Sequence, residues 1–155
     1  MSEHTKKTYY PFMLPFFFQM QPCMNVLFWN CRGLGNSRTV QELCGFVQSY
    51  SPKLVFLSET RMHTSRARNL SWCLGLSRSL AISSVGLSGG LVLFWDESIN
   101  VTLLYQGERA LDVLVNESSG GSPWRTTFVY GGEPVRSQRS PRVASSWVIL
   151  CIWDE

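Results

Sequence analysis

The chain has 155 residues, of which 45% are hydrophobic and only 16% are charged. This length predicts a single domain, and the ordinary apolar content excludes disorder over the whole chain, because disordered proteins combine low hydrophobicity with high charge. No run of about 18 consecutive apolar residues is present, so no transmembrane helix is predicted. The net charge of +3 is too small to imply a nucleic-acid partner by itself.

The cysteine and histidine contents exclude several kinds of site. None of the five cysteines forms a Cys-x-x-Cys pair, so neither a structural zinc site nor a disulfide framework is predicted. This usage fits a reducing compartment, and we expect an intracellular protein, nuclear or cytoplasmic. The only histidines are His4 and His63. Chemistry that needs a histidine in the C-terminal half is therefore excluded for this chain.

Residues 1–23 differ from the rest of the sequence. Lys6 and Lys7 precede a run of aromatic and apolar residues that loosely resembles a secretory signal peptide. Two prolines interrupt this run, and no clear cleavage site follows it. We therefore expect residues 1–23 to be a disordered or poorly packed extension and residues 24–155 to form the folded domain.

The first regular elements predict a strand, a helix and a second strand. Residues 26–29 and 54–57 are short apolar runs that are typical of buried strands. Between them, Asn36 can cap a helix whose apolar residues recur with a period of about 3.6. Ser51 and Pro52 end this helix. The spacing predicts a βαβ-like start.

The rest of the chain predicts one more helix and then strands. The second short helix is expected over residues 66–74. Turn residues separate the apolar runs that follow and predict an antiparallel meander, with strands at 80–83, 91–95, 101–105, 111–115 and 125–130. Residues 148–153 predict a last apolar strand. The sum is an α/β or α+β fold around a mixed sheet.

One short motif has the form of a hydrolase nucleophile elbow. Residues 86–90 satisfy the pattern Gly-x-Ser-x-Gly, which needs a strand before the serine and a helix after it. A strand follows here instead, and no histidine lies beyond His63 to act as the general base. A tight turn between two strands is the better interpretation.

Two polar residues end the first two predicted strands. Asn30 follows the first strand and Glu59 follows the second. Because the carboxyl ends of adjacent strands lie side by side over the crevice where α/β proteins bind ligands, these two side chains are candidate oxygen ligands for Mg²⁺. The alternative from the spacing is that Asn30 caps the loop at Gly33 and that Glu59 pairs with Arg61.

Four longer stretches carry a resemblance to a known family. They are residues 24–35 (MNVLFWNCRGLG), 52–61 (PKLVFLSETR), 88–95 (SGGLVLFW) and 128–134 (FVYGGEP). In this order they resemble the endonuclease domain of plant LINE-type (non-LTR) retrotransposons. That domain belongs to the endonuclease/exonuclease/phosphatase superfamily and is related to apurinic/apyrimidinic endonucleases. The resemblance covers about residues 24–139.

The resemblance implies a fold. The chain is expected to form the first half of a four-layer α/β sandwich, in which two sheets pack face to face with helices outside. An incomplete sandwich leaves an apolar sheet face uncovered, so self-association through that face is expected. Candidates for the core or its exposed remnant are Phe28, Phe56, Phe94 and Trp95.

The resemblance also implies catalytic roles. Asn30 is similar to the asparagine that helps to position the metal and the scissile phosphate. Glu59 is similar to the metal-binding glutamate. Tyr130 is similar to the tyrosine whose hydroxyl group helps to hold the phosphate. The implied cofactor is Mg²⁺ or Mn²⁺, and the implied partner is DNA.

Three further residues are expected to bind the substrate. Ser88 belongs to a Ser-Gly-Gly stretch that lines the site in the family. Arg32 and Arg61 are expected phosphate contacts, and the alternative is that both are solvated loop charges. In such a site Mg²⁺ withdraws charge from the phosphate while water attacks in line.

The sequence departs from the family in the residues that activate water. The family also uses an Asp-x-Asn motif and a late Ser-Asp-His motif, and this sequence contains neither. Asp154 follows the last apolar strand, about where the family has its Asp-x-Asn, and it is a further candidate metal ligand. We therefore expect a truncated domain that binds metal weakly and is inactive alone.

Three functional hypotheses remain open at this point. The first is the incomplete Mg²⁺-dependent DNA endonuclease domain. The second is a non-catalytic nucleic-acid-binding remnant that uses arginine-rich loops on phosphates without reading bases. The third is a decayed open reading frame with no selected function.

Overall fold

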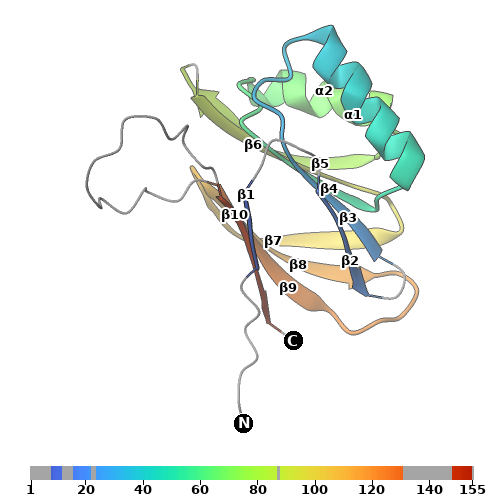
Figure 1. Cartoon of the computed structure of the whole chain (residues 1–155). Coiled ribbons are helices and arrows are strands. Elements are labelled where there is room, and N and C mark those ends of the chain that lie inside the picture. Colours follow the sequence, from blue (N-terminus) through green and yellow to red (C-terminus); the bar gives the residue numbers. More distant parts are fainter. Residues whose placement is uncertain (1–7, 12–15, 22–23, 87, 131–147, 155) are drawn as a thin grey trace.

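The computed structural model describes residues 8–11, 16–21, 24–86, 88–130 and 148–154. This part of the chain has a mixed α/β fold with two helices and two β-sheets (Figure 1). The elements are β1 (Thr8–Pro11), β2 (Phe16–Gln21), β3 (Met24–Asn30), α1 (Ser37–Tyr50), β4 (Leu54–Ser58), α2 (Thr64–Leu74), β5 (Arg78–Val85), β6 (Ser88–Trp95), β7 (Ile99–Gly107), β8 (Ala110–Glu117), β9 (Trp124–Tyr130) and β10 (Val148–Asp154).

The first sheet has the strand order β2-β3-β4-β6-β5. Strands β3 and β4 run parallel and are joined by α1, so the predicted βαβ start is confirmed. The side chain of Asn36 caps α1 by accepting a hydrogen bond of 3.0 Å from the backbone N–H of Arg38. Helix α2 begins at Thr64, two residues before its predicted start, because the ring of His63 caps it.

The second sheet is antiparallel throughout, with the order β1-β10-β9-β8-β7. All five strands of the predicted meander are present, but they do not form one meander. Strands β5 and β6 belong to the first sheet, and only β7, β8 and β9 follow one another in the second. The sequence explains the division, because residues 91–95 of β6 are buried on both faces and suit a central strand next to β4.

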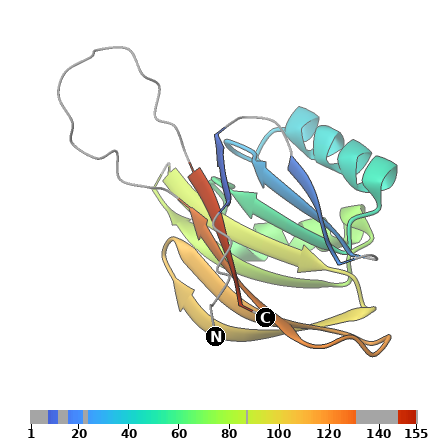
Figure 2. The same ribbon diagram turned by 60° about the horizontal axis from the view of Figure 1, so that its bottom comes forward.

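The first sheet lies between the helices and the second sheet (Figures 1 and 2). Along β3, Val26 and Phe28 pack toward the second sheet, whereas Leu27 and Trp29 pack toward α1 and α2. This alternation is the two-residue period of a strand. No helix in the described part of the chain has the length and apolar character needed to cross a membrane.

The four predicted core candidates are all buried. Phe28, Phe56 and Trp95 lie between the two sheets, and Phe94 lies under the helices. None of them is an exposed remnant. Among the described residues, both helices pack on the first sheet and leave the outer face of the second sheet without a helix. Self-association through this outer face stays a prediction.

Within residues 1–23 the structure differs from the expected disordered extension. Residues 8–11 and 16–21 form strands, and β2 pairs antiparallel with β3 so that Phe16 lies opposite Phe28. Aromatic residues favour strands, which accounts for β2. The other residues of this stretch, like residues 131–147, lie outside the described part of the chain.

Candidate functional site

The structure places Asn30 and Glu59 at neighbouring strand ends, as predicted. In the parallel pair of β3 and β4, Asn30 lies opposite Ser58, and Glu59 follows directly. The pairing continues past both strands, because the N–H of Cys31 donates to the carbonyl of Ser58 at 3.1 Å. Both predicted metal ligands are therefore buried at the same edge of the first sheet.

Tyr130 reaches this edge from the second sheet. The rings of Phe56 and Phe128 stack at 4.7 Å between centroids and fix the sheets against each other. Tyr130 lies two residues beyond Phe128 on the same face of β9, and its hydroxyl group donates a hydrogen bond to Oε1 of Glu59. Both side chains are buried, with exposed fractions of 4% for Glu59 and 5% for Tyr130.

Burial and this contact both favour the protonated form of the Tyr130 hydroxyl group. Burial, and then the hydrogen bond to the Glu59 carboxylate, raise the pKa of Tyr130 well above its usual value. The guanidinium groups of Arg109 and Arg61 act in the opposite direction but do not reverse the shift. Tyr130 is therefore a neutral hydrogen-bond donor at this site.

The two predicted phosphate contacts, Arg32 and Arg61, lie on the loops that follow β3 and β4. The guanidinium of Arg61 lies 3.8 Å from Oε2 of Glu59. The backbone N–H of Arg32 donates to Oδ1 of Asn30 at 3.3 Å. The loop cap and the ion pair that the spacing allowed are thus both present, and they coexist with the Tyr130 contact. Both arginines are exposed and can meet a ligand.

The backbone around the site is unusual. Arg32, Glu59 and Arg61 adopt left-handed conformations, with φ of +48°, +54° and +52°. Such conformations are uncommon for residues other than glycine, and they cluster at ligand-binding sites. Because they occur at Glu59 and at the two predicted phosphate contacts, they support a functional role for these loops.

The start of β6, which contains Ser88, supports the Glu59 loop. The N–H groups of Thr60 and Arg61 donate to the carbonyl groups of Gly90 and Gly89, at 3.1 and 3.0 Å. Gly90 has a φ of +86°, and a Cβ atom there would collide with Oγ1 of Thr60. The motif joins two strands, since β5 ends at Val85 and β6 begins at Ser88, so the interpretation as a turn between strands is confirmed.

Ser88 and Tyr130 line a small cavity of about 160 Å³ beside the site. The β7–β8 turn closes the cavity with Glu108 and Arg109. Arg109 is also fixed next to Tyr130 by its carbonyl group, which accepts a 2.8 Å hydrogen bond from the Tyr130 N–H. The sequence gives no local signal for Arg109, because only the pairing of β8 with β9 brings it here.

The donor atoms at the site fit a weakly held Mg²⁺ ion. Asn30 and Glu59 offer an amide oxygen and a carboxylate, the hard ligands that Mg²⁺ prefers. The buried hydroxyl groups of Ser58 and Thr60 flank Glu59 and have no hydrogen-bond partner in the described part of the chain. An ion with one carboxylate ligand would keep several waters and depend on substrate oxygens.

The structure does not bring Asp154 to this site. Strand β10 runs antiparallel to β9, with Ile149 opposite Tyr130 and Asp154 opposite Arg125. The backbone of Asp154 is thus five residues along the sheet from the end that carries Tyr130, a distance of roughly 17 Å. The antiparallel direction of β10 therefore argues against a role for Asp154 as a ligand in the same site.

Cys31 has a structural role beside the site. Its thiol donates to the carbonyl of Ser58 at 3.3 Å. Burial raises the pKa of the Cys31 thiol to about 12, so it stays protonated at neutral pH. Because only the thiolate is a good nucleophile, covalent catalysis by Cys31 is excluded.

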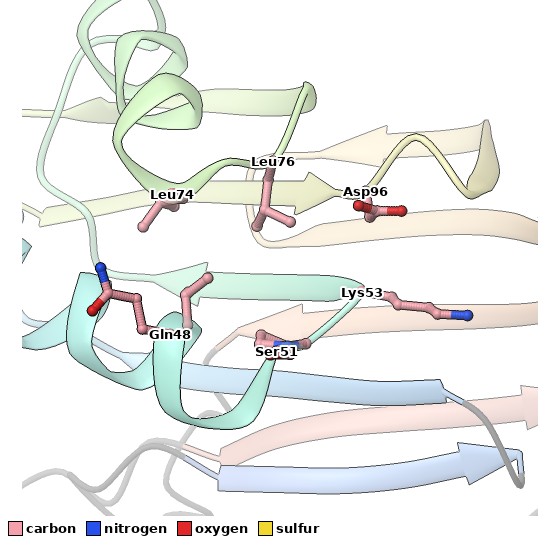
Figure 3. Close-up of a pocket in the computed structure, with 8 residues that line it drawn as sticks. Gln48, Ser51, Lys53, Leu74, Leu76 and Asp96 are labelled. Atoms are coloured by element: carbon pink, nitrogen blue, oxygen red, sulfur yellow. The ribbon is translucent and has the colours of Figure 1, made fainter.

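A larger hollow of about 410 Å³ lies at the other end of the first sheet (Figure 3). The ends of α1 and α2 line it through Val47 and Leu74, and the loops before β4 and after β6 add Lys53 and Asp96. None of the predicted site residues lines this hollow. The chemistry that the sequence predicts therefore belongs to the edge with Glu59.

Comparison with known proteins adds no assignment. No protein-family model and no curated protein sequence matches this chain. The likeness to retrotransposon endonucleases therefore stays a prediction from the four sequence stretches. The arrangement of Asn30, Glu59 and Tyr130 is an independent observation, made from the geometry alone.

Proposed function

We propose that this chain carries the metal- and phosphate-binding part of a retrotransposon-derived, Mg²⁺-dependent DNA endonuclease site, in the first half of a four-layer α/β sandwich. The observation that carries the proposal is the hydrogen bond from Tyr130 to Glu59. It joins residues that lie 71 positions apart in the sequence, and both had been assigned to one site from separate sequence stretches.

The side chains at the site have the chemistry that a phosphodiester needs. Asn30 and Glu59 would hold Mg²⁺, which supplies charge withdrawal from a non-bridging phosphate oxygen. The neutral Tyr130 hydroxyl group can donate to a phosphate oxygen when a ligand displaces its bond to Glu59. The exposed guanidinium groups of Arg61 and Arg109 would neutralise the phosphate by charge-assisted hydrogen bonds.

Among the described residues, no side chain at the site is placed to take the proton of the attacking water. A general base contributes roughly 10²–10⁴-fold to the rate of such a reaction. His63 is the nearest histidine in sequence, but its ring accepts a 3.4 Å hydrogen bond from the Ser65 N–H at the start of α2. We therefore infer that this chain alone binds a phosphodiester without cleaving it.

A second candidate function is nucleic-acid binding without any catalytic role. The exposed arginines Arg32, Arg61 and Arg109 favour it, because guanidinium groups bind phosphates whether or not a metal is present. The two functions differ in what they require of Glu59. Metal-assisted binding needs its carboxylate, whereas binding by arginines alone does not.

Incubation of supercoiled plasmid with the purified chain and excess Mg²⁺ tests the proposal. We expect nicking at background level, and Glu59→Gln should be indistinguishable from the parent in this assay. Plasmid retention on a filter should show binding that Mg²⁺ strengthens in the parent but not in Glu59→Gln. Mg²⁺-dependent nicking that Glu59→Gln abolishes would contradict the inference that the chain only binds. Equal binding with and without Mg²⁺ would favour the second function.

A further inference from the structure

Helix α2 presents an exposed tryptophan. Trp72 is 89% exposed, the highest value among the large hydrophobic side chains of the described residues. Ala67 and Leu74 are the buried residues of this helix, so Trp72 lies on the opposite side. Arg68 and Asn69 precede Trp72 by four and three residues and share its face. We call Arg68, Asn69 and Trp72 the α2 face.

The sequence segment that contains α2 carries charge of one sign. Positions 60–95 contain four arginines and no aspartate or glutamate. Outside this segment, ten basic residues stand against eleven acidic ones, so the net positive charge of the chain comes from the segment that includes α2. Arg66 and Arg68 place two of these charges on the helix itself. This surface is complementary to a polyanion.

Helix α2 begins beside the candidate site and leads away from it. Helix α2 begins three residues after Arg61, and the Thr64 N–H donates to Oγ of Ser83 at 3.3 Å. This bond ties the start of the helix to β5, beside the start of β6 that supports the Glu59 loop. Trp72 lies eight residues further along the helix, at a distance of roughly 12 Å from Thr64. A polynucleotide bound at Glu59 could therefore extend onto α2.

We propose that the α2 face binds single-stranded nucleic acid, with an unpaired base stacked on Trp72 and a backbone phosphate on Arg68. An exposed indole offers a flat surface to any base, and Arg68 beside it can follow the backbone. A duplex keeps its base faces stacked internally and cannot use the indole in this way. The inference rests on the proposed function only for the path of the nucleic acid from the Glu59 site to α2. The contact with Trp72 itself needs no metal.

Fluorescence anisotropy of a labelled oligothymidylate of about 20 nucleotides, in the presence of EDTA, tests this contact. Trp72→Ala should weaken binding by about 5- to 150-fold, the range for loss of one stacked base. Trp72→Phe keeps an aromatic face and should stay within a few-fold of the parent. The control Tyr105→Ala, which removes a 61% exposed aromatic side chain from β7, should bind like the parent.

Several results would overturn the inference. One is an affinity of Trp72→Ala for the oligonucleotide that equals that of the parent. Another is a loss of affinity in Trp72→Ala that is as large for a duplex of equal length as for the single strand. Trp72→Ala could also keep oligonucleotide binding and instead lose binding to phosphatidylserine-containing vesicles or lose a dimer on gel filtration. Either result would assign Trp72 to a lipid or protein contact. A Trp72-dependent interaction that persists when metal binding at Glu59 fails would leave this inference standing and refute the proposed function.

Discussion

Tyr130 is the residue that closes the candidate site. Its hydroxyl group donates to the buried carboxylate of Glu59, whose other oxygen lies 3.8 Å from the half-exposed guanidinium of Arg61. Tyr130→Phe removes this donor and leaves the carboxylate less well satisfied. We expect the free energy of unfolding to fall by about 1–3 kcal/mol, as for other buried polar groups that lose a partner. Urea denaturation measures this change.

Tyr105→Phe is the matched control for this substitution. Tyr105 is 61% exposed on β7, so loss of its hydroxyl group should change stability by no more than about 0.5 kcal/mol. If the two variants lose the same stability, the Tyr130 hydroxyl group does not hold Glu59 in the folded protein.

The site could be predicted from the sequence only in part. Asn30 and Glu59 each end an apolar run, and the carboxyl ends of parallel strands meet at one edge of a sheet. The proximity of the two residues could therefore be predicted from the local sequence pattern. The place of Tyr130 was implied by a resemblance and not by any local rule. Arg109 was missed, because a charged residue in a β-turn has no signal that points across to another strand.

The start of β6, residues 88–90, supports the site through its glycines. A Cβ atom at Gly90 would meet Oγ1 of Thr60 and lie 3.3 Å from the Arg61 nitrogen, in a backbone conformation with φ of +86°. Gly90→Ala should therefore lower the free energy of unfolding by about 2–4 kcal/mol, from backbone strain and crowding together. Thermal or urea denaturation with circular dichroism measures the loss.

Gly120→Ala separates the two causes. Gly120 has a similar φ of +97° but no atom within 4 Å of the position of its Cβ. Backbone strain alone should cost about 1–2 kcal/mol there. The larger loss at Gly90 isolates the crowding against Thr60, and equal losses would show that the Glu59 loop does not pack on the start of β6.

Helices and strands could be predicted closely because each depends on local periodicity. The predicted strands and helices are present, and α2 differs at its start because a histidine ring acts as an N-cap. The distribution of strands between the sheets could not be predicted in the same way. Strand β6 pairs with β4 across more than thirty residues, and such long-range pairing leaves little local trace beyond the continuous burial of residues 91–95.

The two sheets meet at two kinds of contact. An apolar core that includes Phe28, Phe56 and Phe128 fills the space between them, and the Glu59–Tyr130 hydrogen bond joins them at the edge. A ligand that binds Glu59 therefore acts where one sheet is fixed to the other. This arrangement predicts that metal or phosphate binding affects both sheets, although the proposed metal-binding residues lie at the ends of β3 and β4.

Titration of the ¹⁵N-labelled chain with Mn²⁺ tests the site directly, because the paramagnetic ion broadens the amide signals nearest to it. We expect weak binding that broadens residues 30–32 and 58–61 first and Tyr130 with them, since these residues surround the Glu59 carboxylate. Glu59→Gln should lose this local pattern. Uniform broadening, no broadening at this edge, or the same pattern in Glu59→Gln would contradict the metal-binding site at Glu59.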